Sequence, residues 1–385
     1  MGRPLPIFEP PGAAAHHTGT AGLSIALGGG PQPGQAAAGP DGALALRRHP
    51  DWIKARIPSG DNYHELKSLL RGLTLNTVCE EAHCPNIGEC WDQRTATIMI
   101  LGDTCTRACG FCAVKTGKPT VHDLDEPRRV AEAIRGLGLD HVVVTSVARD
   151  DLADGGASVF ADTITRLRDA CPSMGVEVLI PDFNGEEAPL RTVMAAGPDI
   201  LNHNVETVER LQKPVRKRAR YDRSLGVLER AKIYAREFGE ADGAASPRLA
   251  VHTKSSIMVG LGETRPELHQ AFVDLRSVDC DILTLGQYLR PSLAHLPVER
   301  YYHPDEFAEM REEALALGFK HVESGPLVRS SYHARDQVPD AEARRAERAA
   351  RAAGGDVEAV PTSGGESARR GPTVDATGRV IYRAD

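Results

Sequence analysis

The stretch ATIMILGDTCTRACGFC, residues 96–112, decides the fold class because it joins a strand pattern to a cysteine-rich loop. Its first part, ATIMILG, is a continuous apolar run with the length of a buried parallel strand. Three cysteines follow at C-x3-C-x2-C spacing: Cys105, Cys109 and Cys112, here called the first trio. Three thiolates leave a four-coordinate zinc site one ligand short, but they suit an iron–sulfur cubane in which one iron stays open.

Beyond this stretch the sequence alternates strand patterns with helix patterns. Strands are indicated at 141–147, 175–182, 199–206, 255–263, 281–288 and 318–325. Helices with apolar residues at i, i+3 and i+4 are indicated at 127–138, 157–170, 186–197, 223–239, 265–278 and 304–318. Such alternation is typical of βαβ units around a parallel sheet. We therefore predict an α/β fold, a partial parallel (β/α)6-type barrel with N-terminal and C-terminal extensions.

The composition limits the classes of function. The chain has 385 residues and a net charge of −7, with both signs spread throughout, which gives no case for nucleic-acid binding. No apolar run approaches the roughly 18–20 residues that span a bilayer, and the N-terminus lacks the pattern of a signal or transit peptide. We therefore expect a cytoplasmic protein that binds neither nucleic acid nor membrane.

The two ends of the chain differ from the middle. Residues 1–47 are rich in Gly, Ala and Pro and lack apolar periodicity, so we expect them to be disordered. We predict that residues 338–385 are disordered too, or partly helical where DAEARRAERAARAA favours an exposed helix. Between these ends we predict an N-terminal extension at 48–93 and the barrel at 94–337.

A second group of three cysteines precedes the first strand. In CEEAHCPNIGEC, Cys79, Cys84 and Cys90 are spaced C-x4-C-x5-C and are here called the second trio. Clustered cysteines in a reducing compartment are more often metal ligands or redox groups than disulfides. His64 or His83 could complete a Cys3His zinc site, whereas three thiolates also suit an iron–sulfur cluster with one open iron.

Polar residues gather just after the predicted strands, where parallel barrels place their functional residues. Asn202, Asn204 and Glu206 follow one strand and are candidates for binding a cofactor. Arg149 and Asp150 follow another strand, and they could do the same or could pair with each other.

The motif CTRACGFC resembles the C-x3-C-x-aromatic-C signature of the radical S-adenosylmethionine superfamily, with Phe111 as the aromatic residue. The second trio narrows the resemblance to the lipoyl synthase family. Further segments are similar in the same order: CEEAHCPNIGECW, TSVARDDLADGGA, NHNVETV, SIMVGLGET, LTLGQYLRPS and VRSSYHA. The resemblance runs from about Asp51 to Ala334, so it excludes the two ends of the chain.

The resemblance implies two [4Fe-4S] clusters and S-adenosyl-L-methionine (SAM) as cofactors. The first trio would hold the cluster that cleaves SAM to a 5′-deoxyadenosyl radical. The residues expected near the cofactor are Phe111, Asn202, Asn204 and Glu206. The second trio would hold an auxiliary cluster, and Ser331, the second serine of RSSY, would be its fourth ligand.

The activity that the resemblance implies is radical-mediated insertion of two sulfur atoms at C6 and C8 of an octanoyl chain on a carrier lysine. The auxiliary cluster would be the sulfur source. Abstraction of hydrogen from an unactivated methylene needs a reactive radical, which no acid or base in the chain could replace. The implied partners are octanoylated carrier domains (the glycine cleavage H protein or 2-oxoacid dehydrogenase E2 subunits), an external electron donor such as ferredoxin or flavodoxin, and iron–sulfur assembly or carrier proteins.

Two alternative functions stay open at this point. One is another radical SAM enzyme with two clusters that modifies a different substrate. The other is an iron–sulfur or zinc scaffold protein without turnover, which an open iron position and a polar barrel rim disfavour.

Two further segments each have a structural and a functional interpretation. GLGE, Gly260–Glu263, is either a turn that ends a strand or a close backbone approach to a ligand. The basic run KPVRKRARYDRS, residues 213–224, is usually a solvated face, but it could help to dock an acidic carrier domain.

Overall fold

The computed structural model describes residues 49–338 and, further on, 373–374 and 380–381. Within the first range there are gaps at 56–57, 59, 93–96, 138, 140 and 242–250. The predicted disorder of residues 1–47 lies outside the described residues, as does most of the predicted tail. Four tail residues form a short antiparallel pair, β9 (Thr373–Val374) and β10 (Val380–Ile381).

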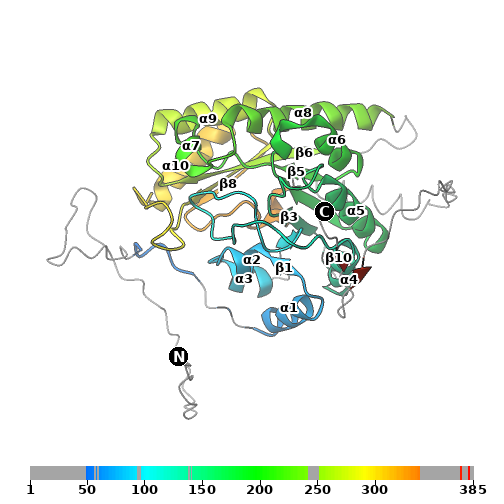
Figure 1. Ribbon diagram of the computed structural model, residues 1–385. Coiled ribbons are helices and arrows are strands. Elements are labelled where there is room, and N and C mark those ends of the chain that lie inside the picture. Colours follow the sequence, from blue (N-terminus) through cyan, green and yellow to red (C-terminus); the bar gives the residue numbers. More distant parts are fainter. Residues whose placement is uncertain are drawn as a thin grey trace, which may run out of the picture.

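One open eight-stranded sheet organises the fold, and its strand order follows the chain from β1 to β8 (Figure 1). The strands are β1 (Asn76–Thr77), β2 (Thr97–Ile100), β3 (His141–Ser146), β4 (Gly175–Leu179), β5 (Ile200–Asn202), β6 (His252–Val259), β7 (Ile282–Gln287) and β8 (His321–Gly325). Strands β2 to β8 pair in parallel, whereas β1 pairs antiparallel with β2. Among the described residues β8 pairs with β7 alone, so strand pairing does not close the barrel.

One long helix follows each of β2 to β7. These helices are α4 (Glu126–Leu137), α5 (Ala157–Ala170), α6 (Glu187–Ala195), α8 (Tyr221–Ala241), α9 (Arg265–Ser277) and α10 (Pro304–Ala316), with a short α7 (Gln212–Val215) before α8. Six βα units followed by a last strand confirm the predicted partial barrel. No helix in the described part of the chain is long and apolar enough to cross a membrane.

The helices form where the sequence pattern predicts them because their apolar faces pack on the sheet. In α4 the residues Val130, Ile134 and Leu137 are all buried, as their spacing requires. Helix α9 begins at a capping box, in which Thr264 and Glu267 satisfy each other's backbone N–H groups. Amphipathic spacing and local capping thus fix both the packing and the start of these helices.

The two faces of the sheet differ in chemistry. Val144 of β3 packs in the same hydrophobic cluster as Phe160 of α5, so this face of the strand meets the helices. The preceding residue, Val143, points the other way and lies in register with Thr97 of β2 and Glu177 of β4. The inner face of the barrel therefore carries polar side chains at this level.

The N-terminal extension contains three helices that the sequence pattern does not predict: α1 (Asp61–Gly72), α2 (Val78–Glu81) and α3 (Ile87–Asp92). Figure 1 shows them near β1, at the end of the molecule away from α8 and α9. The rings of Tyr63 and Trp91 lie 5.2 Å apart and join α1 to α3. Both rings are buried in the same hydrophobic cluster as Ile98 of β2, so the extension shares the core of the barrel.

The chain after β8 turns back over the inner face of β7. A side chain at Gly286 of β7 would place its Cβ 2.0 Å from the Val328 carbonyl oxygen, so this close approach requires glycine. Asn86 in the N-terminal extension donates from Nδ2 to the Leu327 carbonyl oxygen at 2.7 Å. The C-terminal extension of the barrel thus lies against its N-terminal extension.

Candidate active site

The first trio lies in the loop between β2 and α4, and hydrogen bonds hold that loop on both sides. Cys105 forms a short parallel bridge with Thr116. The Gly110 N–H donates to the Val215 carbonyl at 2.9 Å, and the Gly110 carbonyl accepts from the Leu296 N–H at 2.9 Å. A Cβ at position 110 would lie 2.9 Å from the Leu296 side chain, so this contact also needs a glycine.

The thiols of the first trio are close enough to act on one another electrostatically. Burial, reinforced by the other thiols of the trio, raises the pKa of Cys109 to about 12 and that of Cys112 to about 11. Partly buried thiols such as Cys109 and Cys112, with pKa values raised in this way, keep their protons unless a cationic centre replaces them. Iron supplies such a centre, so the donor set fits the iron–sulfur cluster that the sequence predicts.

Asn204 and Glu206 extend from the end of β5 to the first trio. Asn204 Nδ2 donates to Glu206 Oε1 at 3.1 Å, and the Glu206 charge acts on both Cys109 and Cys112. Asn204 Oδ1 is buried and has no hydrogen-bond partner among the described residues. An orphaned buried polar atom on the residue that holds Glu206 fits a polar ligand at this place.

Arg216 also lies beside the first trio, although the sequence pattern does not single it out. Its side chain donates to the Val205 carbonyl and to Ser224 Oγ, each at 3.2 Å, and the residue is buried. Its positive charge interacts electrostatically with Glu206 and Cys109, but its side chain is hydrogen-bonded to neither. A buried guanidinium that makes no hydrogen bond to a carboxylate within the described chain can receive an anionic group.

Asn202 and Phe111 are placed differently from the other candidates. Asn202 Nδ2 donates to Glu177 Oε1 at 3.0 Å, and Glu177 is paired with Lys254 at 2.9 Å on the inner face of the barrel. Phe111 packs against the hydrophobic cluster under α9 and α10. Asn202 thus joins a buried ion pair and Phe111 anchors the cysteine loop, and their contact with a cofactor stays a prediction.

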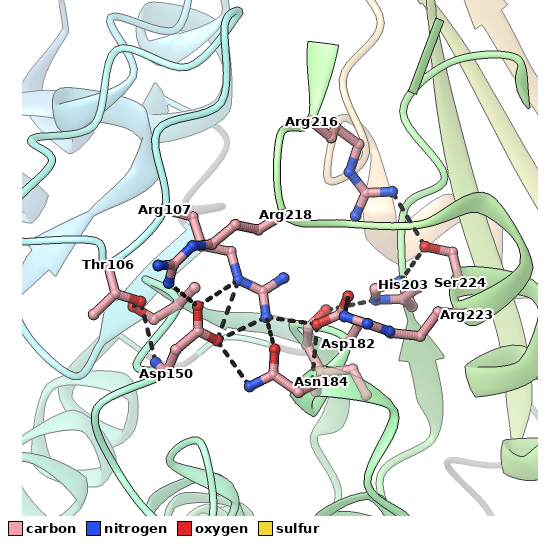
Figure 2. Close-up of polar contacts among 12 residues, drawn as sticks. Thr106, Arg107, Asp150, Asp182, Asn184, His203, Arg216, Arg218, Arg223 and Ser224 are labelled. Carbon is pink, nitrogen blue, oxygen red and sulfur yellow. Dashed lines mark hydrogen bonds and ion pairs between the residues drawn. The ribbon is translucent and has the colours of Figure 1, made fainter. Parts of the chain in front are cut away.

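Arg149 and Asp150 do not pair with each other, contrary to one of the two expectations. Arg149 Nε donates to Asp151 Oδ1 at 2.9 Å. Asp150 instead accepts from Arg107, whose Nη2 lies 2.7 Å from Asp150 Oδ1 (Figure 2). Adjacent carboxylates in a loop point in different directions, and the sequence does not show which of them an arginine meets.

The second trio lies in the N-terminal extension. Cys79 belongs to α2, Cys84 follows in the next turn, where its N–H donates to the Cys79 carbonyl at 3.0 Å, and Cys90 belongs to α3. Burial, reinforced by Cys84, raises the pKa of Cys79 to about 11. Burial together with Cys79 and Cys84 also raises the pKa of Cys90. Because these thiols are free and act on one another electrostatically, as those of the first trio do, they fit a second cluster.

Ser331 reaches the second trio from the far end of the barrel. Thr97 Oγ1 donates to Ser331 Oγ at 2.7 Å, and the Thr97 backbone N–H opposes the rise in the pKa of Cys79. The hydroxyl of Tyr332 donates to Glu89 Oε1 at 3.4 Å, one residue before Cys90. The segment after β8 therefore places the Ser331 hydroxyl against Thr97, whose backbone N–H contacts Cys79. Its role as a fourth ligand stays a prediction.

The zinc alternative for the second trio has no geometric support. His64 and His83 are both exposed, and His64 packs edge-on against Tyr63. In the described part of the chain, no three Cys, His, Asp or Glu side chains are arranged to hold a single metal ion. Neither histidine therefore completes a Cys3His site here.

The segment GLGE forms a turn that its own glutamate closes. Glu263 accepts from the Gly260 N–H at 2.6 Å and from the Leu261 N–H at 2.9 Å. Gly260 has a φ of 102°, and a Cβ there would lie 2.5 Å from the Arg300 carbonyl oxygen. These close contacts come from the chain itself, which favours the structural interpretation.

The basic run at 213–224 is not a uniformly solvated face. Arg216 is buried, and Arg223 Nη1 donates to Asp182 Oδ2 at 3.2 Å. Lys213 and Lys217 are exposed. The run thus contributes arginines to the barrel rim and lysines to the surface beside the cysteine loop.

Comparison with known proteins bears on the same residues. The model of the radical SAM superfamily matches residues 99–275, and that of the N-terminal domain of lipoyl synthase matches residues 41–84. A lipoyl synthase of Symbiobacterium thermophilum is 59% identical over 300 residues, which is 78% of this chain and 90% of that protein. Lipoyl synthases of Koribacter versatilis (57% over 289 residues, 75% and 91%) and Rubrobacter xylanophilus (56% over 292 residues, 76% and 87%) are similar over the same extent.

Proposed function

Because this chain belongs to the lipoyl synthase family, we propose that it inserts two sulfur atoms, at C6 and C8, into an octanoyl chain on a carrier lysine to give lipoyl-lysine. It is accordingly a sulfurtransferase of the radical SAM class, with two [4Fe-4S] clusters and SAM as cofactors. The observation that carries this proposal is the presence of two separate groups of free thiols that interact electrostatically, with Thr97 linking Ser331 to Cys79 of the second group.

The first trio is proposed to hold the cluster that binds SAM. When bound, the cluster and SAM supply the alkyl radical that hydrogen abstraction from a methylene requires. The residues of the chain orient SAM there. The Arg216 guanidinium suits the carboxylate of the methionine moiety, and the Glu206 carboxylate suits a cationic group. Asn204 Oδ1, which has no partner within the described residues, would accept a hydrogen bond from the same ligand.

The second trio and Ser331 are proposed to hold the auxiliary cluster. Three thiols from α2, α3 and the turn between them supply three ligands, and the hydroxyl next to Thr97 supplies the fourth. A serine oxygen holds iron less tightly than a thiolate does. Ser331 therefore suits a site whose sulfur is consumed during turnover.

The proposed macromolecular partners follow from this reaction. The substrates are octanoylated carrier domains, with the glycine cleavage H protein and 2-oxoacid dehydrogenase E2 subunits as candidates. A ferredoxin or flavodoxin would supply electrons, iron–sulfur assembly proteins would restore the auxiliary cluster, and these steps would take place in the cytoplasm. The exposed Lys213 and Lys217 support docking of an acidic carrier beside the first trio, because Val215 between them is hydrogen-bonded to Gly110.

Mass spectrometry tests the proposal. Anaerobically reconstituted protein is given a reductant, SAM and an octanoylated carrier peptide, and the peptide is examined for two added sulfur atoms. Cys105→Ala should abolish formation of 5′-deoxyadenosine, whereas Cys79→Ala should retain some of it without inserting sulfur. Cys171→Ala is the matched control, since Cys171 lies outside both trios. Cleavage of SAM without sulfur insertion by the unaltered protein would point to another substrate, and a lack of cleavage would point to a scaffold.

A further inference from the structure

Arg107 is the middle one of the three residues between Cys105 and Cys109, and its side chain lies in a polar network with Asp150, Asp182 and Asn184 (Figure 2). Its Nε lies 2.9 Å from Asp150 Oδ2 and its Nη2 lies 2.7 Å from Asp150 Oδ1, which is a bidentate pair. The same Nη2 lies 2.6 Å from Asp182 Oδ1 and 3.1 Å from Asn184 Oδ1. One guanidinium thus meets two carboxylates and an amide.

The partners of Arg107 belong to the carboxyl ends of two neighbouring strands. Asp150 follows β3, and Asp182 and Asn184 follow β4. Arg107 and Asp182 are among the buried charged residues, with side-chain exposures of 7% and 0%. A second attachment lies beside the first, since the Thr106 N–H donates to the Ala148 carbonyl at 3.0 Å. The cysteine loop is therefore docked on the rim of the barrel at two consecutive residues.

The network remains charged over the working range of pH. Although burial acts to raise the pKa of Asp182, the hydrogen bond and charge of Arg107 hold that pKa at about 2. The pKa of Asp150 is also lowered by Arg107, against the effect of burial. Both carboxylates are ionised at neutral pH, so the bidentate contact does not depend on a proton.

The backbone N–H of Arg107 contacts the first trio directly. Its N–H donates to Cys105 Sγ at 3.4 Å. Hydrogen bonds to the sulfurs of an iron–sulfur cluster are among the factors that set its reduction potential. Fixing the side chain of Arg107 at the rim therefore also fixes a donor that points at a ligand of the first trio.

We propose that Arg107 is a positioning residue, which sets the arrangement and electronic environment of the first trio by tying the backbone between Cys105 and Cys109 to Asp150 and Asp182. This inference rests on the proposed role of the first trio. Residues around a metal site that orient its ligands typically change metal affinity or activity by about 10- to 100-fold when replaced. Arg107→Lys keeps the charge but loses the fork geometry that bidentate binding needs.

A matched control exists on the surface. Arg128 of α4 makes an equally short bidentate contact with Asp125, with both N–O distances at 2.8 Å, but both side chains are exposed. Arg128→Lys therefore repeats the chemical change of Arg107→Lys away from the cysteine loop. Asp150→Asn is a second, milder variant, because it leaves Arg107 paired with Asp182.

The first measurement is amide hydrogen exchange on cluster-free protein. Arg107→Lys and Asp150→Asn should raise deuterium uptake in peptides that cover 103–117 while leaving those of α5 unchanged, and Arg128→Lys should change neither. The second measurement is the electron paramagnetic resonance spectrum of the reduced first cluster, which should shift in the same two variants. SAM cleavage should fall about 10- to 100-fold.

Unchanged exchange at 103–117 in both variants, or an increase of equal size throughout the chain, would overturn the positioning role. Cys105→Ala distinguishes a failure of the proposed function of the first trio from a failure of the inference about Arg107. If that variant still cleaves SAM, the proposed function of the first trio fails. If it is inactive while Arg107→Lys and Asp150→Asn keep the unaltered exchange, spectrum and cleavage rate, only the inference about Arg107 fails.

Discussion

The buried ion pair on the inner face of the barrel allows a direct test of how much a buried charge pair contributes to the free energy of unfolding. Lys254 of β6 lies with its Nζ 2.9 and 3.1 Å from the two oxygens of Glu177 on β4, and neither side chain has any exposed surface. Asn202 of β5 donates to the same carboxylate at 3.0 Å. Although burial acts to raise it, the Lys254 charge holds the pKa of Glu177 below its ordinary value.

Lys254→Met removes the cation and leaves the Glu177 carboxylate buried with the Asn202 amide and the His141 ring, whose Nε2 lies 3.7 Å away, as its partners. Breaking one side of a buried pair costs about 3–5 kcal/mol, which is about two to four orders of magnitude in the folding equilibrium. The sign of the pH dependence also follows. In the variant the folded pKa of Glu177 should lie above its unfolded value, so the loss should be larger at pH 7 than at pH 5.

The double variant Glu177→Gln with Lys254→Met removes both charges and keeps an acceptor for Asn202. Replacing both partners of a buried pair is often nearly neutral, so we expect the double variant to recover most of the lost stability. Urea unfolding of cluster-free protein, followed by circular dichroism, gives the free energies for a double-mutant cycle. The exposed pair Arg191–Glu237, at 2.7 Å, is the control, and we expect no measurable coupling there.

Two results would refute this reasoning. One is a decrease of less than about 1 kcal/mol in the free energy of unfolding for Lys254→Met at pH 7. That result would mean that other groups solvate the Glu177 carboxylate. The other is strict additivity of the two single variants, which would mean that the pair is not coupled in the folded state.

Three further predictions concern the ends of the barrel and its rim. Ser331→Cys should still form 5′-deoxyadenosine with octanoyl substrate but give little lipoyl product, because a thiolate holds iron more tightly than a serine oxygen does. Ser330→Cys is the control. A normal yield of lipoyl product from the Ser331 variant would remove this serine from the mechanism. Gly286→Ala should lower the midpoint of thermal unfolding and displace Ser331, because the added Cβ would lie 2.0 Å from the Val328 carbonyl oxygen. Gly72→Ala is the control and should be neutral or stabilising, because open space surrounds that position. Equal midpoints for the two variants would contradict the close approach at Gly286. His203 is buried, and burial together with Arg216 lowers its pKa to about 4, so the unfolded chain binds a proton below pH 6.5 that the folded chain does not. The free energy of unfolding should therefore fall by about 2–3 kcal/mol more in the unaltered protein than in His203→Gln between pH 7.5 and pH 4.5, and a constant difference would exclude this titration.

The repeating part of the fold could be predicted from the sequence because each unit carries its own signal. The pattern at 157–170 coincides with α5, and the other five predicted helices agree with the observed ones to within a few residues at each end. The N-terminal extension was not predicted as helices. Strand β1 has two residues, Asn76 and Thr77, and it exists because it pairs with Ile98 and Met99, a tertiary contact that leaves no periodic trace.

The candidate site was predictable where a motif names the ligand and not where a contact is formed by folding. Arg107 lies inside the motif that decides the fold, but nothing in its spacing indicates Asp150 and Asp182 as partners. Arg216 belongs to a basic run that composition alone assigns to solvent, whereas the turn between α7 and α8 carries it inward to Ser224. Long-range polar contacts of this kind depend on which loops the strand order brings together.

Strand β2 sets the interval between the two trios. Its first residue, Thr97, donates a hydrogen bond to Ser331, and the Thr97 backbone N–H contacts the Cys79 thiol. The chain beyond its last residue, Ile100, leads to Cys105. Four strand residues rise about 10 Å from first to last. All four are buried, and the strand is paired on both sides, so this interval is rigid. With the proposed roles of the two trios, a substrate carbon activated beside the first trio would have to reach the second across a fixed spacing. A one-residue insertion in β2 would both lengthen that spacing and reverse the faces of the residues that follow.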